Sequence, residues 1–235
     1  MARTRLVLPS IGRDDAGRWD LAGALSLQEK LAVAVIETDR PGSVRLVAGA
    51  DVSYDAQGDR FFAAVVVLDA ATLEVVETAS HVGRVGFPYV PGLLSFREAP
   101  GVLEAYARLR SQPDLLLVDG HGRAHPRRFG IACHLGTLLD VPTIGVAKSL
   151  LVGEAGEPGP ERGRMAPLVD RGERVGTVLR TRSRVAPVYV SVGHRVALAT
   201  AARRVLACAR RYRIPEPTRL AHHLVVSLRQ SRAGS

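Results

Sequence analysis

Hydrophobic and polar positions in the first half of the chain follow two different periods. Three runs, residues 44–54, 61–68 and 74–82, are rich in β-branched residues and are separated by short Asp-containing segments typical of turns. These runs predict an antiparallel three-stranded meander. Upstream, apolar and charged residues in helical rhythm predict a helix over residues 24–37, which Pro41 and Gly42 would end.

The pattern then changes to apolar strands that alternate with helical segments. Residues 115–118 form an unbroken apolar run typical of a strand buried on both faces. A helix over 129–139 and a strand over 143–148 would complete a strand–helix–strand unit with parallel pairing. Ser95 is placed to cap a helix over 96–111, with Glu98 completing a capping box. The remaining predictions are a loop or short hairpin at 154–172, strands at 176–182 and 187–192, a helix at 196–212, and a last helix capped by Thr218.

Composition places the chain among globular proteins. Its 235 residues are 46% hydrophobic and contain no repeat or low-complexity linker, so we expect a single domain over residues 1–235. No apolar run approaches membrane-spanning length, and the first five residues lack a secretion signal. We therefore expect a cytoplasmic protein without a membrane partner. Cys133 and Cys208 lie in apolar helical segments and should be buried, reduced thiols.

The charge of the chain points to a polyanionic partner. The formal net charge is +9 and the pI is about 10.5, values that favour nucleic-acid binding. Genomic bias toward arginine would also produce this balance. Lysine occurs only at positions 30 and 148, and Lys148 follows directly on a predicted strand.

Two carboxylates occupy unusual positions in the predicted sheet. Asp119 ends the 115–118 strand, where ligands gather in α/β proteins, although it could equally be a turn or cap residue. Asp51 lies inside a strand, where an unpaired carboxylate is costly and a cation would compensate it. From spacing alone, capping is the better interpretation of Glu98. Likewise, Tyr89 on its Pro-flanked loop is more simply explained as covering a core edge than as contacting bases.

The chain lacks the motifs of several enzyme classes. It has no Gly-x-Ser-x-Gly or His-Glu-x-x-His, and a glycine and a proline around His121 and His125 argue against zinc. Carboxylate oxygens on Asp51, Glu98 and Asp119 suit Mg²⁺, which can activate water in phosphodiester hydrolysis. A meander followed by helix, strand, helix, strand predicts an α/β fold with a ribonuclease H-like mixed sheet flanked by helices.

Six motifs are spread over most of the chain. They read Ala-Gly-Ala-Asp51-Val-Ser-Tyr, Pro88-Tyr-Val-Pro-Gly-Leu-Leu-Ser-Phe-Arg-Glu98, Val-Asp119-Gly-His-Gly-Arg-Ala-His125-Pro-Arg, Gly-Val-Ala-Lys148-Ser, Tyr189-Val-Ser-Val-Gly-His194 and Glu216-Pro-Thr-Arg-Leu-Ala-His222. With these motifs in this order, the chain closely resembles the endonuclease V family of deoxyinosine-directed repair nucleases. The wedge motif has Val90 where the family often has Ile. The segment 154–169 matches no motif of the family.

The resemblance implies a role for each matching residue and reverses two assignments made above. Glu98 joins the metal site and Tyr89 becomes part of a strand-separating wedge. The implied catalytic residues are Asp51, Glu98, Asp119, Lys148 and His222, all but Lys148 also holding Mg²⁺, for which Mn²⁺ can substitute. The implied DNA-binding residues are Pro88, Tyr89, Pro91, Gly92, Arg97, His125 and Arg128. Backbone at Gly92, Gly120 and Gly122 would form the pocket for the base.

The implied reaction is hydrolysis of the second phosphodiester bond 3′ to deoxyinosine, leaving 3′-hydroxyl and 5′-phosphate ends. The implied partner is deoxyinosine-containing DNA, and we expect a monomer. Three alternatives stay open: a nuclease acting on inosine in RNA, a structure-directed nuclease of the same fold, and a nucleic-acid-binding protein without catalysis.

Overall fold

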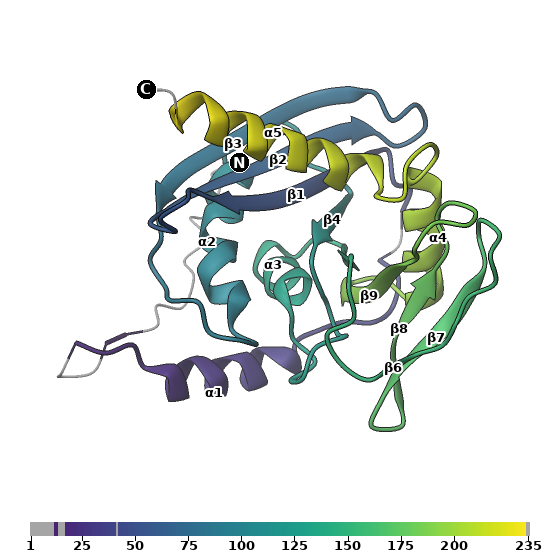
Figure 1. The fold of residues 1–235 in the computed structure, drawn as a ribbon, viewed down its shortest axis with the longest axis horizontal. Helices are drawn as coiled ribbons and strands as arrows, with labels where there is room; N and C mark the ends of the chain where they lie inside the picture. Colours follow the sequence, from purple (N-terminus) through teal and green to yellow (C-terminus); the bar gives the residue numbers. More distant parts are fainter. Residues whose placement is uncertain (1–11, 14–16, 41, 234–235) are drawn as a thin grey trace.

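A nine-stranded sheet forms the centre of the computed structural model, which describes residues 12–13, 17–40 and 42–233 (Figure 1). The strand order is β3-β2-β1-β4-β5-β9-β8-β7-β6. The strands are β1 (Leu46–Tyr54), β2 (Arg60–Asp69), β3 (Val75–Arg84), β4 (Leu115–Asp119), β5 (Thr143–Ala147), β6 (Glu154–Ala155), β7 (Met165–Asp170), β8 (Glu173–Leu179) and β9 (Val188–His194). The helices are α1 (Leu21–Ala32), α2 (Leu94–Tyr106), α3 (Ile131–Leu139), α4 (Leu198–Cys208) and α5 (Glu216–Ala233).

The pairing of the strands confirms the predicted mixed sheet. β1, β2 and β3 form the antiparallel meander, whereas β4 is parallel to both β1 and β5. β9 then returns antiparallel to β5. Because β1, β4 and β5 run in the same direction, their carboxyl ends meet at one edge of the sheet. Asp119 ends β4 and Lys148 directly follows β5, so both residues lie at this end of the sheet.

Helices cover the sheet on both faces (Figure 1). Helices α4 and α5 pack on one face, where Val205 and Ala221 join a core with Leu115 and Leu117 of β4. Helices α2 and α3 pack on the other face, together with the alternate β4 residues Leu116 and Val118. Successive strand residues point to opposite faces, so an unbroken apolar run is what a doubly covered strand requires. Among the described residues, no helix is long and apolar enough to span a membrane.

Both predicted threonine and serine caps are wrong. Helix α2 starts at Leu94, so Ser95 lies inside its first turn, and the buried Ser95 hydroxyl has no hydrogen-bond partner among the described residues. Helix α5 already starts at Glu216, and the Thr218 hydroxyl donates to the carbonyl of Pro215. The capping-box interpretation of Glu98 therefore fails, which leaves its side chain available for another role.

Several element boundaries also differ from the sequence prediction: α2 ends at Tyr106, α4 ends at Cys208, and β8 spans Glu173–Leu179. Helix α1 begins earlier, with the Asp20 side chain accepting a bond from the Gly23 amide, and ends at Ala32 before the β-branched residues Val33, Val35 and Ile36. Within residues 154–172, the hairpin alternative is correct: the short β6 pairs antiparallel with β7. β7 then pairs with β8 through a turn at Arg171 and Gly172. The buried, unpaired state of the Cys133 and Cys208 thiols is confirmed.

Candidate active site

The register between β1 and β4 places two carboxylates side by side. Ala50 pairs with Val118, so Asp51 and Asp119 are the next residues on adjacent parallel strands. Both side chains are largely shielded from solvent, at 11% and 14% exposure. Asp51 and Asp119 therefore lie next to each other near the carboxyl ends of their strands.

Glu98 approaches this pair from the first turns of α2. Its carboxylate accepts a bond from the hydroxyl of Tyr54, at 3.3 Å, at the end of β1. The guanidinium of Arg97 lies over the ring of the same tyrosine, 4.6 Å from its centroid. Burial and the nearby Glu98 charge raise the pKa of Tyr54, so its hydroxyl remains a donor at neutral pH. Tyr54 thus fixes one oxygen of Glu98.

Each aspartate has a basic partner from an element that follows it in the chain. Nδ1 of His222, on α5, lies 2.8 Å from Oδ2 of Asp51. The ammonium of Lys148, just after β5, forms an ion pair with Oδ2 of Asp119. The Lys148 and His222 side chains are 44% and 50% exposed, so both groups stand at the solvent side of the acids. His223 lies outside this contact.

The three carboxylates repel one another electrostatically. Burial, followed by the charge of Asp51, raises the pKa of Glu98 to about 8. Burial, followed by the charge of Asp119, also raises the pKa of Asp51. Raised carboxyl pKa values mean that the protein alone does not fully compensate the negative charge at this point. A cation bound among these oxygens would supply that compensation.

The donor set fits a hard divalent cation, although the ligands are not preassembled. Within the described part of the chain, no three His, Cys, Asp or Glu side chains already surround one point as a metal site. The three carboxylates nonetheless supply oxygen donors of the kind that Mg²⁺ and Mn²⁺ take. Burial, followed by the charge of Asp51, disfavours the ionised form of Glu98, and a bound divalent ion would favour that form.

The loop that carries Tyr89 ends in a tight turn. The Leu93 amide donates to the Val90 carbonyl at 2.9 Å, with Pro91 and Gly92 in the central positions. Gly92 has φ +78°, which a type II turn requires at this position and which glycine adopts without strain. Tyr89 is 70% exposed. It therefore points outward, and the simpler interpretation that it covers a core edge is wrong.

Several residues expected to contact DNA have partners inside the protein. Arg97 donates to the carbonyls of Phe87 and Gly58. Arg128 pairs with Asp170 at 2.7 Å and Glu173 at 2.6 Å, and thereby joins the basic loop to the β7–β8 hairpin. His125 is buried at 5% exposure, and burial lowers its pKa to about 4, so its ring is neutral at pH 7.

The glycines after Asp119 pack tightly against neighbouring elements. A Cβ at Gly122 would lie 2.0 Å from the Val192 carbonyl oxygen, and the Gly122 amide donates to the Ser191 hydroxyl at 2.8 Å. A Cβ at Gly120 would lie 2.7 Å from Cγ2 of Ile131. These contacts bring β9 and α3 against the loop that follows Asp119.

Sequence reasoning missed Tyr54 and Gln28 as site residues. Tyr54 lies within the same motif as Asp51, but nothing in the spacing indicates that it bonds Glu98. Gln28 follows Ala24 by four residues on the apolar stripe of α1 and is fully buried. An amide on the buried face of a helix must find partners, and that requirement was a usable signal.

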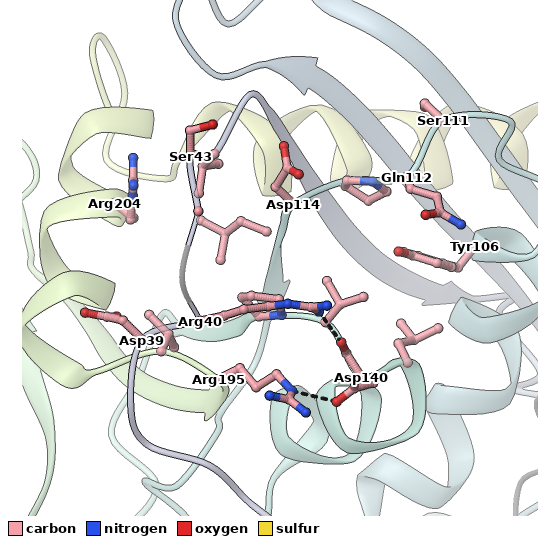
Figure 2. Close-up of a pocket in the computed structure, with 18 of the residues that line it drawn as sticks. Asp39, Arg40, Ser43, Tyr106, Ser111, Gln112, Asp114, Asp140, Arg195 and Arg204 are labelled. Carbon is pink, nitrogen blue, oxygen red and sulfur yellow. Dashed lines mark hydrogen bonds and ion pairs between the residues drawn. The ribbon is translucent and has the colours of Figure 1, made fainter.

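A polar pocket of 1130 Å³ lies at the opposite edge of the sheet, where β4 and β5 begin (Figure 2). Its aspartates are engaged within the protein. Asp114 accepts bonds from the Arg45 and Leu46 amides. Asp140 pairs with Arg195 at 2.6 Å, as the dashed line in Figure 2 marks. This pocket is separate from the carboxylate cluster, which lies where the parallel strands end.

Comparison with known proteins agrees with this geometry. The family model described as Endonuclease V matches residues 29–223. A curated endonuclease V from Roseiflexus sp. is 57% identical over 204 residues, covering 87% of this chain and 91% of the relative. The crystal structure of the Streptomyces avermitilis endonuclease V has a TM-score of 0.88 at 46% identity, covering 97% of this chain and 98% of the other.

A third relative was crystallised with nucleic acid. The structure of Ciona intestinalis endonuclease V, in complex with a 24mer DNA containing an inosine followed by a ribo-adenosine, has a TM-score of 0.80 at 29% identity. The match covers 90% of this chain and 98% of the Ciona chain. The mixed sheet and the acidic cluster at its edge define an α/β nuclease. Within that class, the chain belongs to the endonuclease V family.

Proposed function

We propose that this chain is a divalent-metal-dependent DNA repair endonuclease that recognises deoxyinosine and hydrolyses the second phosphodiester bond on its 3′ side. The products would carry 3′-hydroxyl and 5′-phosphate ends. The observation that carries this proposal is geometric: Asp51 and Asp119 lie side by side on β1 and β4, and Glu98 reaches them from α2. Burial, followed by the charge of Asp51, raises the pKa of Glu98 to about 8, in agreement with this crowding. Family membership and the inosine-containing complex of the Ciona relative support the choice of substrate.

In this proposal, Asp51, Glu98 and Asp119 hold Mg²⁺ or Mn²⁺, with His222 assisting. When bound, the ion supplies activation of the attacking water and stabilisation of negative charge on the leaving oxygen. His222 orients Asp51 through its Nδ1 contact, and the Tyr54 hydroxyl orients Glu98. Lys148 holds its ammonium at the solvent side of Asp119, where it would contact the scissile phosphate.

Recognition requires the base to leave the stack. A hypoxanthine pair is weaker than a normal pair, so extrusion costs less than the few kcal/mol otherwise required. Tyr89, exposed at the tip of its loop, would fill the gap that the base leaves. The backbone at Gly92, Gly120 and Gly122 would then contact the extruded base.

The test uses a labelled duplex with one deoxyinosine, incubated with Mg²⁺ or with EDTA. The expected product is a single nick one nucleotide beyond the inosine, absent with EDTA and absent from the same duplex carrying adenine. The Asp51→Ala and Asp119→Ala proteins should still bind the duplex but leave it intact. Cleavage that survives EDTA or either substitution would contradict the assigned site.

A second candidate substrate is inosine next to a ribonucleotide. The oligonucleotide bound by the Ciona relative has a ribo-adenosine after its inosine. The assay should therefore include matched strands with deoxyribose and ribose at that position. Binding of the deoxyinosine duplex without cleavage, together with cleavage of the ribose strand, would reassign the enzyme to RNA.

A further inference from the structure

The loop that carries Tyr89 is held at both ends by side chains from other parts of the chain. At its beginning, Nη1 of Arg97 donates to the Phe87 carbonyl at 2.9 Å. At its end, the Gly92 carbonyl accepts two bonds, from Nε2 of Gln28 at 3.1 Å and from Nη2 of Arg127 at 2.7 Å. Tyr89 stands between these two fixed points.

Both polar atoms of the Gln28 side-chain amide form hydrogen bonds with other segments of the chain. Besides Gly92, its Nε2 donates to the Phe129 carbonyl at 2.8 Å, and its Oε1 accepts a bond from Nε of Arg127. The side chain is 0% exposed. Gln28 therefore joins α1 to two separate segments: the turn at Gly92 and the basic loop that follows Asp119. We call this arrangement of Gln28, Arg127 and the Gly92 carbonyl the glutamine clamp.

Apolar packing supports the same junction. Phe87, Leu93 and Phe96 form a buried cluster with Ala24 of α1, and the partly buried Trp19 and Leu27 pack against it. Phe87 contacts the rings of both Trp19 and Phe96, with centroids 5.3 and 5.8 Å apart. The buried face of α1 thus packs against both ends of the Tyr89 loop.

We propose that the glutamine clamp is a positioning device for the Tyr89 wedge, in which Gln28 and Arg127 act through Gly92 without touching DNA. The inference rests on the proposed function, because only strand separation requires a rigid wedge. Separating stacked bases costs free energy, and a tyrosine on a yielding loop would be displaced instead of entering the duplex. The turn at Gly92 limits the loop locally, and the clamp ties that turn to the segment following Asp119.

The first test measures the loop itself and needs no substrate. Gln28→Leu keeps the side-chain volume close to that of glutamine and removes all three amide contacts. Amide hydrogen exchange at Leu93, whose N–H closes the turn, should become at least about tenfold faster. Arg127→Met, which removes the other half of the clamp, should act in the same direction and serves if Gln28→Leu folds poorly. Unchanged exchange in both variants would overturn the proposal.

The second test separates positioning from general damage. Inosine is presented in a duplex and in a single strand, which needs no wedge. Gln28→Leu should lower kcat/KM for the duplex by about ten- to a hundredfold. The loss on the single strand should be at least about fivefold smaller, because there only the contact of the Gly92 backbone with the base is disturbed. Leu109→Ala is the control for lost stability, because Leu109 is buried in a core cluster that does not include α1. This variant should not change the ratio of kcat/KM for the duplex to kcat/KM for the single strand.

A double variant completes the test. In a Tyr89→Ala background the wedge is absent, so Gln28→Leu should cause no loss on the duplex beyond the loss that it causes on the single strand. Equal losses of Gln28→Leu on both substrates, or additive losses in the double variant, would overturn the proposal. If the wild-type protein cleaves neither inosine substrate, the proposed function fails, and the exchange measurement still decides whether the clamp fixes the loop.

Discussion

Arg128 lies in the basic loop after Asp119, but its guanidinium is bonded within the protein. It contacts Asp170 and Glu173, and its side chain is 16% exposed. Its backbone has φ +56°, a conformation unusual for a residue other than glycine. Such strain persists only where surrounding contacts hold it. The ion pairs therefore fix the basic loop against the β7–β8 hairpin.

Arg128→Ala should consequently reduce stability more than DNA affinity. Loss of two charge-assisted hydrogen bonds that are largely shielded from water should lower the free energy of unfolding by about 2 kcal/mol. Affinity for inosine DNA, measured in Asp119→Ala protein to prevent cleavage, should change less than about threefold. Urea denaturation and fluorescence anisotropy measure the two quantities. A large loss of affinity at unchanged stability would instead make Arg128 a phosphate contact.

His134 provides a test of pH dependence. Its ring is 0% exposed, neither nitrogen has a hydrogen-bond partner among the described residues, and it packs against the rings of Phe96 and Phe129. Burial lowers its pKa to about 4. The unfolded chain binds a proton as the pH falls below about 6.5, whereas the folded protein does not until about 4. Stability should therefore fall as the pH drops through this window.

In His134→Phe protein this contribution disappears, and the ring packing is kept. The drop in unfolding free energy between pH 7.5 and 4.5 should shrink by about 2 kcal/mol relative to wild type. Urea denaturation at both pH values gives the comparison, with the exposed His223→Phe variant as control. An unchanged drop in His134→Phe protein would show that His134 does not resist protonation.

At the residue scale, the sequence was most informative where a side chain conflicts with its surroundings. Asp51 and Asp119 could be predicted because a carboxylate in or at the end of an apolar strand needs compensation. Glu98 could not be predicted from spacing, because a capping box and a site carboxylate leave the same local pattern. Its side chain is recruited by tertiary contact with β1, which only the family motif indicated. Tyr54 was missed for the same reason, whereas the place of Gln28 on the apolar face of α1 was a local signal that was not used.

At the scale of elements, the site depends on how closely α5 crosses β1. A Cβ at Gly49 would lie 2.0 Å from the backbone carbon of Pro217 and 2.4 Å from the Thr218 nitrogen. Asp51 follows Gly49 on β1 by two residues, and His222 lies one turn further along α5. The distance between Asp51 and His222 is therefore set by this glycine.

Gly49→Ala should separate the two elements and disturb both folding and catalysis. Overpacking against backbone, which cannot rotate away, should lower the unfolding free energy by about 3 kcal/mol. Nicking activity should fall with it, because His222 moves away from Asp51. Gly86→Ala is the matched control, since a Cβ there meets nothing within 4 Å. Wild-type stability and activity in Gly49→Ala protein would mean that the crossing is looser than the structure indicates.

Element types could be predicted more reliably than element ends. The strands followed from β-branched runs, and each predicted helix exists. The ends depend on contacts that spacing does not record: α1 starts at an Asp20 cap, and the last helix begins at Glu216 before its predicted cap. Residues 154–172 were left as a loop or a hairpin because Gly, Pro and charged residues are equally typical of both. The contacts of β7 and β8 with the basic loop, through Arg128 and Ala124, join residues that are distant in the sequence.

At the scale of the whole molecule, the topology could be predicted from the order of the elements. Which of the arginines contact a polyanionic partner could not be predicted in this way. Parallel pairing of β1, β4 and β5 was enough to bring Asp51, Asp119 and Lys148 to one edge. The formal charge of +9 indicated a polyanionic partner without saying which arginines would contact it. Arg97, Arg127 and Arg128 all bond within the protein. The remaining charge must act as a field around the site or through other contacts.

The salt dependence of binding measures how much of that charge reaches phosphate. With about five phosphate contacts, affinity for inosine DNA should fall about 500-fold between 50 and 200 mM salt, because counterions are released on binding. Anisotropy titrations with Asp119→Ala protein give the slope. An inosine-free duplex should show the same slope with weaker binding, since phosphate contacts position the protein and do not read the base. A slope near zero would mean that the excess charge of this chain takes no part in DNA binding, and that recognition depends on the wedge and the base alone.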